Sequence, residues 1–295
     1  MVDRAVFGLF LGFLQPIIYA YVANVFVDAN RRASAYGFGN VAFNVGAVFA
    51  SSVGGICVAI GWNAAFWLYC VGLVVLVCVL VFYKEPDLGI DVQADDGKRV
   101  RITPIAWFYM AVFLVAQVLD YPFFTVLISC MVEHGISDAV LGGQMLSLFT
   151  LVGIVASALF GRIFKQVGMM TLPTAFVICA VGLGLMFLGI GVMSSLPVAV
   201  VAVCVLGLGH MLITVGIPHY VSITCAPAVA SAALAFTAVF MNLGTFVSSP
   251  YIQFVGDAAG GDYVMVFLVS AALMMIVAGA VFTATIKARK GAENE

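Results

Sequence analysis

The positively charged residues of this chain fall almost entirely into every second connection between long apolar segments. Each of nine segments approaches or exceeds the roughly 20 apolar residues that a helix needs to cross a bilayer. These segments are 5–27, 34–58, 63–83, 105–131, 139–161, 170–192, 197–217, 228–254 and 263–286. Laid out as spanning helices, they put eleven of the twelve Lys and Arg residues on one side, and only Arg4 breaks the pattern. The positive-inside rule predicts that this side, which includes the C-terminus, is cytoplasmic.

The composition excludes a soluble domain. The chain is 64% hydrophobic and 9% charged, with a mean hydropathy of +1.18. In lipid, a bundle of helices satisfies this much backbone, and the segments are too long for barrel strands. We therefore expect an all-α, multi-pass integral protein of the cell membrane, in contact with the lipid bilayer.

Cofactor and metal chemistry have no support in the sequence. The seven cysteines form no C-x-x-C pair and have no second ligand at metal spacing, so we expect neither a metal site nor a disulfide framework. No G-x-x-x-x-G-K-[ST] pattern is present, so we expect a gradient and not ATP as the energy source. The basic clusters are signals of topology and do not predict a nucleic-acid partner.

One connection is much longer than the others. The stretch from Lys84 to Thr103 holds five of the fourteen acidic residues and four of the twelve basic ones. Interpreted as a cytoplasmic linker over 84–104, it divides an incomplete N-terminal bundle of three helices, 1–83, from a C-terminal bundle of six, 105–286. Residues 287–295 form a predicted cytoplasmic tail.

An internal repeat relates the two parts. Residues 35–51 recur as residues 233–249 at an offset of 198, and the identical pairs are Ala35/Ala233, Phe38/Phe236, Val41/Val239, Asn44/Asn242, Gly46/Gly244 and Ser51/Ser249. Two matched halves side by side are a common transporter layout. The same offset places the start of the first half about ninety residues before Met1, so we expect three helices to be missing there. A native nine-helix protein is the alternative.

Three short patterns resemble motifs of the major facilitator superfamily. They are Arg4-x-x-x-Gly8, the series Gly37-x8-Gly46-x3-Ala50-Ser51-x2-Gly54-Gly55, and Gly161-Arg-Ile-Phe-Lys165-Gln166-Val-Gly168. The second is similar to the family's antiporter motif, with Ala50-Ser51 where the family has Gly-Pro. The third resembles a cytoplasmic loop motif, with Lys165-Gln166 in place of Asp-Arg. The resemblance implies a two-bundle transporter represented here by helices four to twelve, N-terminally truncated and monomeric when complete.

The second pattern also has a physical interpretation. Gly46, Ala50 and Gly54 recur every four residues, which is typical of a helix face that packs closely on another helix. Gly37, Ser51 and Gly55 complete this predicted packing motif. We expect Asn44 and Asn242 to make hydrogen bonds between helices.

Two ionisable residues stand near the middle of predicted spans. A charged group there is costly, so Asp120 and His210 are the leading candidates for a substrate or proton site. The resemblance places them in helices seven and ten, which line the family's central cavity. The alternatives are a structural ion pair or kink hydrogen bond beside Pro122 for the acid, and a core histidine for His210.

Other polar residues are weaker candidates for the same pathway. They are Gln117, Gln15, Tyr19 and Arg4, of which Arg4 is also a candidate interfacial anchor. We interpret His219 and Tyr220 as residues at the cytoplasmic membrane boundary.

The sequence thus predicts secondary active transport of a small solute by alternating access, coupled to protons, with export favoured by the antiporter-like spacing. Uptake of a small organic anion or nutrient by a symporter or exchanger is an alternative. A truncated, non-functional transporter fragment is another. An integral membrane enzyme is disfavoured, because no clustered acid, base and nucleophile accompany the adjacent Asp95 and Asp96.

Overall fold

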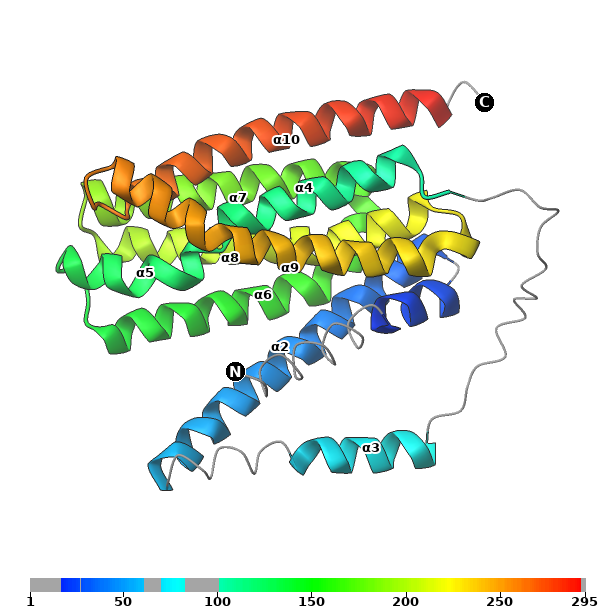
Figure 1. Ribbon diagram of the computed structural model, residues 1–295, viewed down its shortest axis with the longest axis horizontal. Coiled ribbons are helices and arrows are strands. Elements are labelled where there is room, and N and C mark those ends of the chain that lie inside the picture. The colour runs from blue at the N-terminus through cyan, green and yellow to red at the C-terminus, as the bar shows by residue number, and fades with distance from the viewer. Residues whose placement is uncertain (1–16, 27, 61–69, 83–100, 293–295) are drawn as a thin grey trace.

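A computed structural model of the chain describes residues 17–26, 28–60, 70–82 and 101–292, and within them it contains helices and no strands (Figure 1). The side chains of residues 50–60 lie outside this description. A short helix covers residues 17–25. It is followed by α2 (Ala29–Ile60), α3 (Val71–Phe82), α4 (Pro104–Asp120), α5 (Pro122–Glu133), α6 (Ala139–Val167), α7 (Thr171–Phe187), α8 (Leu196–Thr224), α9 (Pro227–Ala258) and α10 (Met265–Ala292). A 3-10 turn, η2 (Gly168–Met170), precedes α7, and a π-helical turn, η3 (Leu188–Val192), follows it.

Much of this helical structure is long and apolar enough to cross a bilayer. Five runs of the described residues qualify, and one of them, Leu141–Val192, contains both α6 and α7. The shorter α3 is apolar and exposed along its whole length. The expected count of nine spans, and the division of the chain at 84–104, stay predictions.

The charges are sorted between the two ends of the bundle. The start of α4 and the ends of α6 and α10 lie at the end where the C-terminus emerges in Figure 1. Arg101 lies just before α4, and Lys165 and Lys287 lie in α6 and α10. The ends of α5 and α9 and the turns that follow them lie at the opposite end, and their charged residues are acidic, Glu133, Asp138, Asp257 and Asp262. We call the first of these the basic end. This arrangement is the one that the positive-inside pattern requires of spanning helices.

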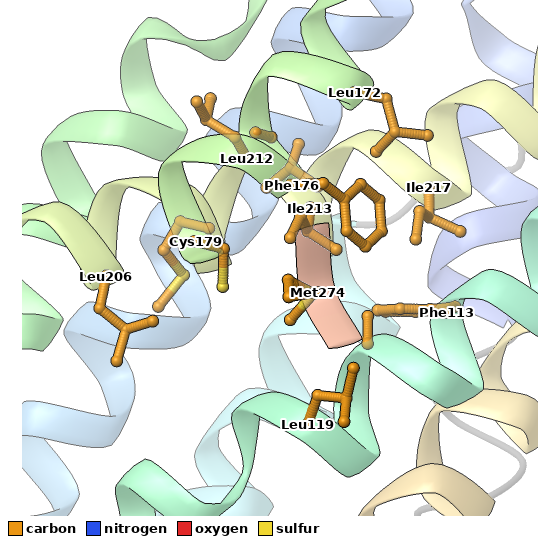
Figure 2. Close-up of a cluster of buried hydrophobic side chains, with 14 of the residues drawn as sticks. Phe113, Leu119, Leu172, Phe176, Cys179, Leu206, Leu212, Ile213, Ile217 and Met274 are labelled. Carbon is orange, nitrogen blue, oxygen red and sulfur yellow. The ribbon is translucent and has the colours of Figure 1, made fainter. Parts of the chain in front are cut away.

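The core lies where α4, α7, α8 and α10 meet. Figure 2 shows Phe113 of α4, Phe176 of α7, Ile213 of α8 and Met274 of α10 in one cluster, and all four are buried. Glycines bring the backbones of α7 and α8 together: a Cβ atom on Gly182 would lie 2.7 Å from the amide nitrogen of Leu206. Because lipid tails are as apolar as these side chains, such close packing and not burial from water holds the helices together.

The predicted segment 105–131 corresponds to one candidate span, Pro104–Glu133, which a break at Tyr121 divides into α4 and α5. Residue 122 is a proline, which has no N–H to donate and which begins α5 at its first position. The carbonyl of Val118 therefore loses its usual helical partner. It accepts a hydrogen bond from the Ser248 hydroxyl of α9 at 3.1 Å instead. The break leaves Asp120 as the last residue of α4.

Two helices extend beyond their expected ends on the basic side. α6 continues from 161 to Val167, so the predicted loop motif is helical as far as Gly168, whose φ of +61° ends the helix. α8 continues from 217 to Thr224 with Pro218 inside it. A proline is tolerated inside a spanning helix because neighbouring groups stabilise the backbone that it interrupts.

Of the first half, α2 is the element best placed against the rest. It packs along α6 and also contacts α8. The helix over 17–25 joins it through Tyr19, whose carbonyl accepts a 3.0 Å hydrogen bond from the Tyr36 hydroxyl. The contacts of α2 with α6 and α8 thus join the described parts of the two predicted halves.

Candidate functional site

Asp120 and His210 meet inside the bundle. The break at Pro122 ends α4 at Asp120, and α8 carries His210 across from it. Oδ2 of the carboxylate accepts a hydrogen bond from Nδ1 of the imidazole. The exposed fractions are 2% for Asp120 and 9% for His210, so both polar groups are removed from solvent. The two residues that the sequence selects separately are therefore one buried pair.

The surroundings of this pair are mostly apolar. The rings of Phe124 and Phe149 lie 5.7 and 5.3 Å from the imidazole ring, centroid to centroid. The second imidazole nitrogen, Nε2, is 3.4 Å from the hydroxyl of Thr214. Oδ1 of Asp120 is buried and has no hydrogen-bond partner in the described part of the chain. This oxygen is an acceptor that a proton or a polar ligand group could occupy.

Gln117 lies one turn before Asp120 but at a different contact. It is buried where α4 meets α9, and a Cβ atom on Gly244 would lie 2.8 Å from its Cβ. The same Cβ would collide with the carbonyl oxygen of Leu114. The position of Gln117 therefore indicates a packing contact between α4 and α9 beside the buried pair.

Tyr19 belongs by its described contacts to a second polar cluster, toward the basic end. Its ring lies 5.9 Å from that of Tyr36, which in turn lies 6.2 Å from His219 of α8. His219 is completely buried, and the rings of Phe160, Phe164 and Tyr220 also surround it. Neither ring nitrogen of His219 has a hydrogen-bond partner among the described residues. α8 extends past His219 and Tyr220 to Thr224, and both side chains are buried between helices. Their expected position at the cytoplasmic membrane boundary stays a prediction.

Arg32 connects the two halves next to this cluster. Its guanidinium donates to the carbonyl of Phe26 at 2.7 Å and, across the junction, to the carbonyl of Ser222 at 2.9 Å. A weaker contact of 3.4 Å reaches the Ser222 hydroxyl. The start of α2 is thus held to the end of α8 by charge-assisted hydrogen bonds, which are among the strong ones in proteins.

Asn40 makes a hydrogen bond between helices. Its side-chain amide donates to the hydroxyl of Ser157 on α6 at 2.7 Å. The side-chain amides of Asn44 and Asn242 each donate to a carbonyl of their own helix, those of Asn40 and Ala238. The interhelix role expected of Asn44 and Asn242 stays a prediction.

The predicted packing motif is described only in part. A Cβ atom on Gly37 would collide with the carbonyl oxygen of Ser157, so α2 and α6 approach closely there. Gly46 has no described neighbour within 4 Å of such an atom. The motif positions whose side chains lie outside the described residues are Ala50, Ser51, Gly54 and Gly55. The same is true of Gln15 and Arg4.

The Asp120–His210 pair does not line either of two grooves on the described surface. The larger, about 890 Å³, lies between α2 and α6 at the basic end. The smaller, about 380 Å³, lies beside Tyr109 and Lys287. Within the described residues, no group of three His, Cys, Asp or Glu side chains is placed to hold a metal ion.

Sequence reasoning missed Arg32, Asn40 and His219. Arg32 is one of the basic residues that the charge pattern assigns to one side of the membrane. That pattern does not show which groups its side chain contacts. Asn40 stands three residues after Gly37, which puts both on one face of a helix, and this spacing could have identified it. The predicted segment 197–217 ends before Pro218, so the sequence does not place His219 inside a helix.

The comparisons with known proteins agree with this architecture. The family model described as Major Facilitator Superfamily matches residues 1–249. No curated protein matches the chain.

Proposed function

The chain belongs to the major facilitator superfamily, whose members are transporters and not enzymes, and we propose that it couples movement of a small solute to protons through Asp120 and His210. Secondary transport of a small solute in a membrane follows from the family itself. In such proteins two bundles rock about a site near the middle of the bilayer, so that the site faces each side in turn. The proton coupling and its residues are our proposal.

The observation that supports this proposal is the buried Asp120–His210 pair, in which Oδ1 of Asp120 has no partner among the described residues. A carboxylate and an imidazole are both proton acceptors, and their hydrogen bond allows either group to hold a shared proton. An ionisable group inside a membrane is costly, which favours a functional role over a packing role. Because the pair joins α4 to α8, a change in its protonation also changes a contact between two helices.

The direction of transport is proposed from the sequence alone. The antiporter-like spacing of α2 favours export in exchange for protons. Uptake of a small organic anion or nutrient is the second candidate, favoured by Ala50-Ser51 where the antiporter motif has Gly-Pro. We also propose a cell-membrane location, a cytoplasmic C-terminus and a monomeric state.

The test compares two modes of transport in proteoliposomes that contain the full chain. Candidate solutes are screened first for uptake or efflux driven by a pH gradient, which also gives the direction. Asp120→Asn is then measured both for gradient-driven accumulation and for solute exchange at equal pH on both sides. Asn keeps the size of Asp and can still accept from His210 but cannot take up a proton, so we expect exchange to persist and accumulation to be lost.

Asp257→Asn is the matched control, because Asp257 is an exposed acid in the last turn of α9. It should change neither mode. Gradient-driven accumulation that survives in Asp120→Asn would refute the proton role of this pair. Absence of any solute movement by the wild-type chain would refute transport by this polypeptide.

A further inference from the structure

The larger groove is lined by both cationic and exposed apolar side chains. It lies where the start of α2 crosses the end of α6 at the basic end. Three cations line it, Arg31 from α2 and Arg162 and Lys165 from α6. Exposed apolar side chains, Phe38 and Leu159, line it as well. A charged head and an apolar body could therefore occupy it together.

The groove depends on a close crossing of the two helices. A Cβ atom on Gly161 would collide with the hydroxyl of Ser34, and one on Gly37 with the carbonyl of Ser157. These contacts bring α2 beside α6 and place Arg31 on the same groove as Arg162 and Lys165. The cationic lining is thus supplied jointly by the two predicted halves.

The three cations are not neutralised within the described part of the chain. No ion pair is formed there by Arg31, Arg162 or Lys165, and no described acid lines the groove. The nearest carboxylate in sequence, Asp28, is exposed and caps α2 by accepting from the amide of Arg31 at 2.8 Å. The positive charge of the groove therefore lacks a counterion from the described protein.

We propose that this groove binds the headgroup of an anionic phospholipid. The phosphate would contact the three cations, and an acyl chain would run along Phe38, whose exposed fraction is 62%. Basic pockets between spanning helices on the cytoplasmic side are suited to such headgroups, and the leaflet there is rich in anionic lipid. Because the cations come from both halves, the lipid would hold the conformation in which α2 and α6 cross closely.

The test measures lipid retention by the full chain. The protein is equilibrated in nanodiscs of phosphatidylcholine with increasing phosphatidylglycerol, and bound lipid is quantified by native mass spectrometry. The groove variant is Arg162→Gln with Lys165→Gln. The matched control is Arg101→Gln with Lys287→Gln, which also removes one Arg and one Lys from the basic end but from outside this groove.

We expect the groove variant to bind phosphatidylglycerol about 30-fold more weakly, roughly fivefold for each cation removed near the membrane surface. The control variant should bind it within about twofold of the wild type. Equal losses in both variants would overturn the proposal, because they would indicate general attraction to a charged surface. Equal retention of phosphatidylcholine and phosphatidylglycerol by the wild type would also overturn it.

Discussion

Substitution of His219, whose imidazole lacks hydrogen-bond partners among the described residues, should raise the stability of the protein, whereas most core substitutions lower it. Both ring nitrogens are buried without hydrogen-bond partners in the described residues, inside a cage of four aromatic rings. Phe offers a ring of similar shape without polar atoms. We therefore expect His219→Phe to stabilise the protein.

The magnitude follows from the groups that are removed. An unsatisfied buried donor or acceptor costs about 1–3 kcal/mol, and His219 has one of each. The Phe ring is somewhat larger, and overpacking costs about 1–3 kcal/mol in a tight core. The edge-on contact with Phe164, at 4.4 Å between ring centroids, is a geometry that two Phe rings also favour. The net expectation is a gain of about 1–2 kcal/mol, or a rise in Tm of roughly 2–8 °C.

The same substitution at His210 is the control, because it lies on the same helix with the opposite environment. His210→Phe removes the partner of a buried carboxylate, and breaking a buried pair in this way costs about 3–5 kcal/mol. The two variants should therefore shift the Tm in opposite directions.

Thermal unfolding can be followed with a thiol-reactive dye. Cys130, Cys179 and Cys225 are buried and should react only on unfolding, whereas Cys70 and Cys78 are exposed and set the initial signal. A fall in Tm for His219→Phe comparable with that of His210→Phe would refute the reasoning. It would mean that the nitrogens of His219 are bonded in the working protein.

Three further substitutions test the contacts between helices. Gly244→Val should destabilise the protein by about 1–3 kcal/mol, because the Val side chain would collide with α4. The repeat-related Gly46→Val should have little effect on stability. Similar Tm values for the two variants would contradict the packing described. Ser248→Ala leaves the carbonyl of Val118, which Pro122 cannot satisfy, without its partner. Thermal unfolding should show a loss of about 1 kcal/mol, and an unchanged Tm would argue against that bond. Arg32→Gln removes the charge-assisted hydrogen bonds to α8 and should raise the rate at which the thiol dye labels Cys225 about tenfold in the folded protein. An unchanged labelling rate would show that these bonds do not hold the end of α8 in place.

Helix positions were largely predictable because the bilayer sets the length of an apolar segment. The expected segment 228–254 became α9, Pro227–Ala258, and 263–286 became α10, Met265–Ala292. The differences occur at a proline and at charged residues. Pro122 divides one candidate span into two helices, and α6 continues through Arg162 and Lys165 to Val167, beyond the end of its apolar segment at 161.

The sequence selects Asp120 and His210 as candidates but does not show that they are in contact. Asp120 and His210 stand out because ionisable groups are rare inside spans. Their separation of ninety residues carries no information on contact, which depends on α4 and α8 being neighbours in the bundle. His219 was unpredictable for a related reason: its burial depends on rings supplied by α2 and α6.

The hydroxyl bond from Ser248 to Val118 has a mechanical consequence. It anchors the final turn of α4 to α9, on the near side of the break at Pro122. A tilt of α5 about that hinge would carry Phe124 away from the imidazole of His210, while Asp120 stayed fixed to the anchored half. Water would then reach the pair through the movement of α5, which contains neither Asp120 nor His210.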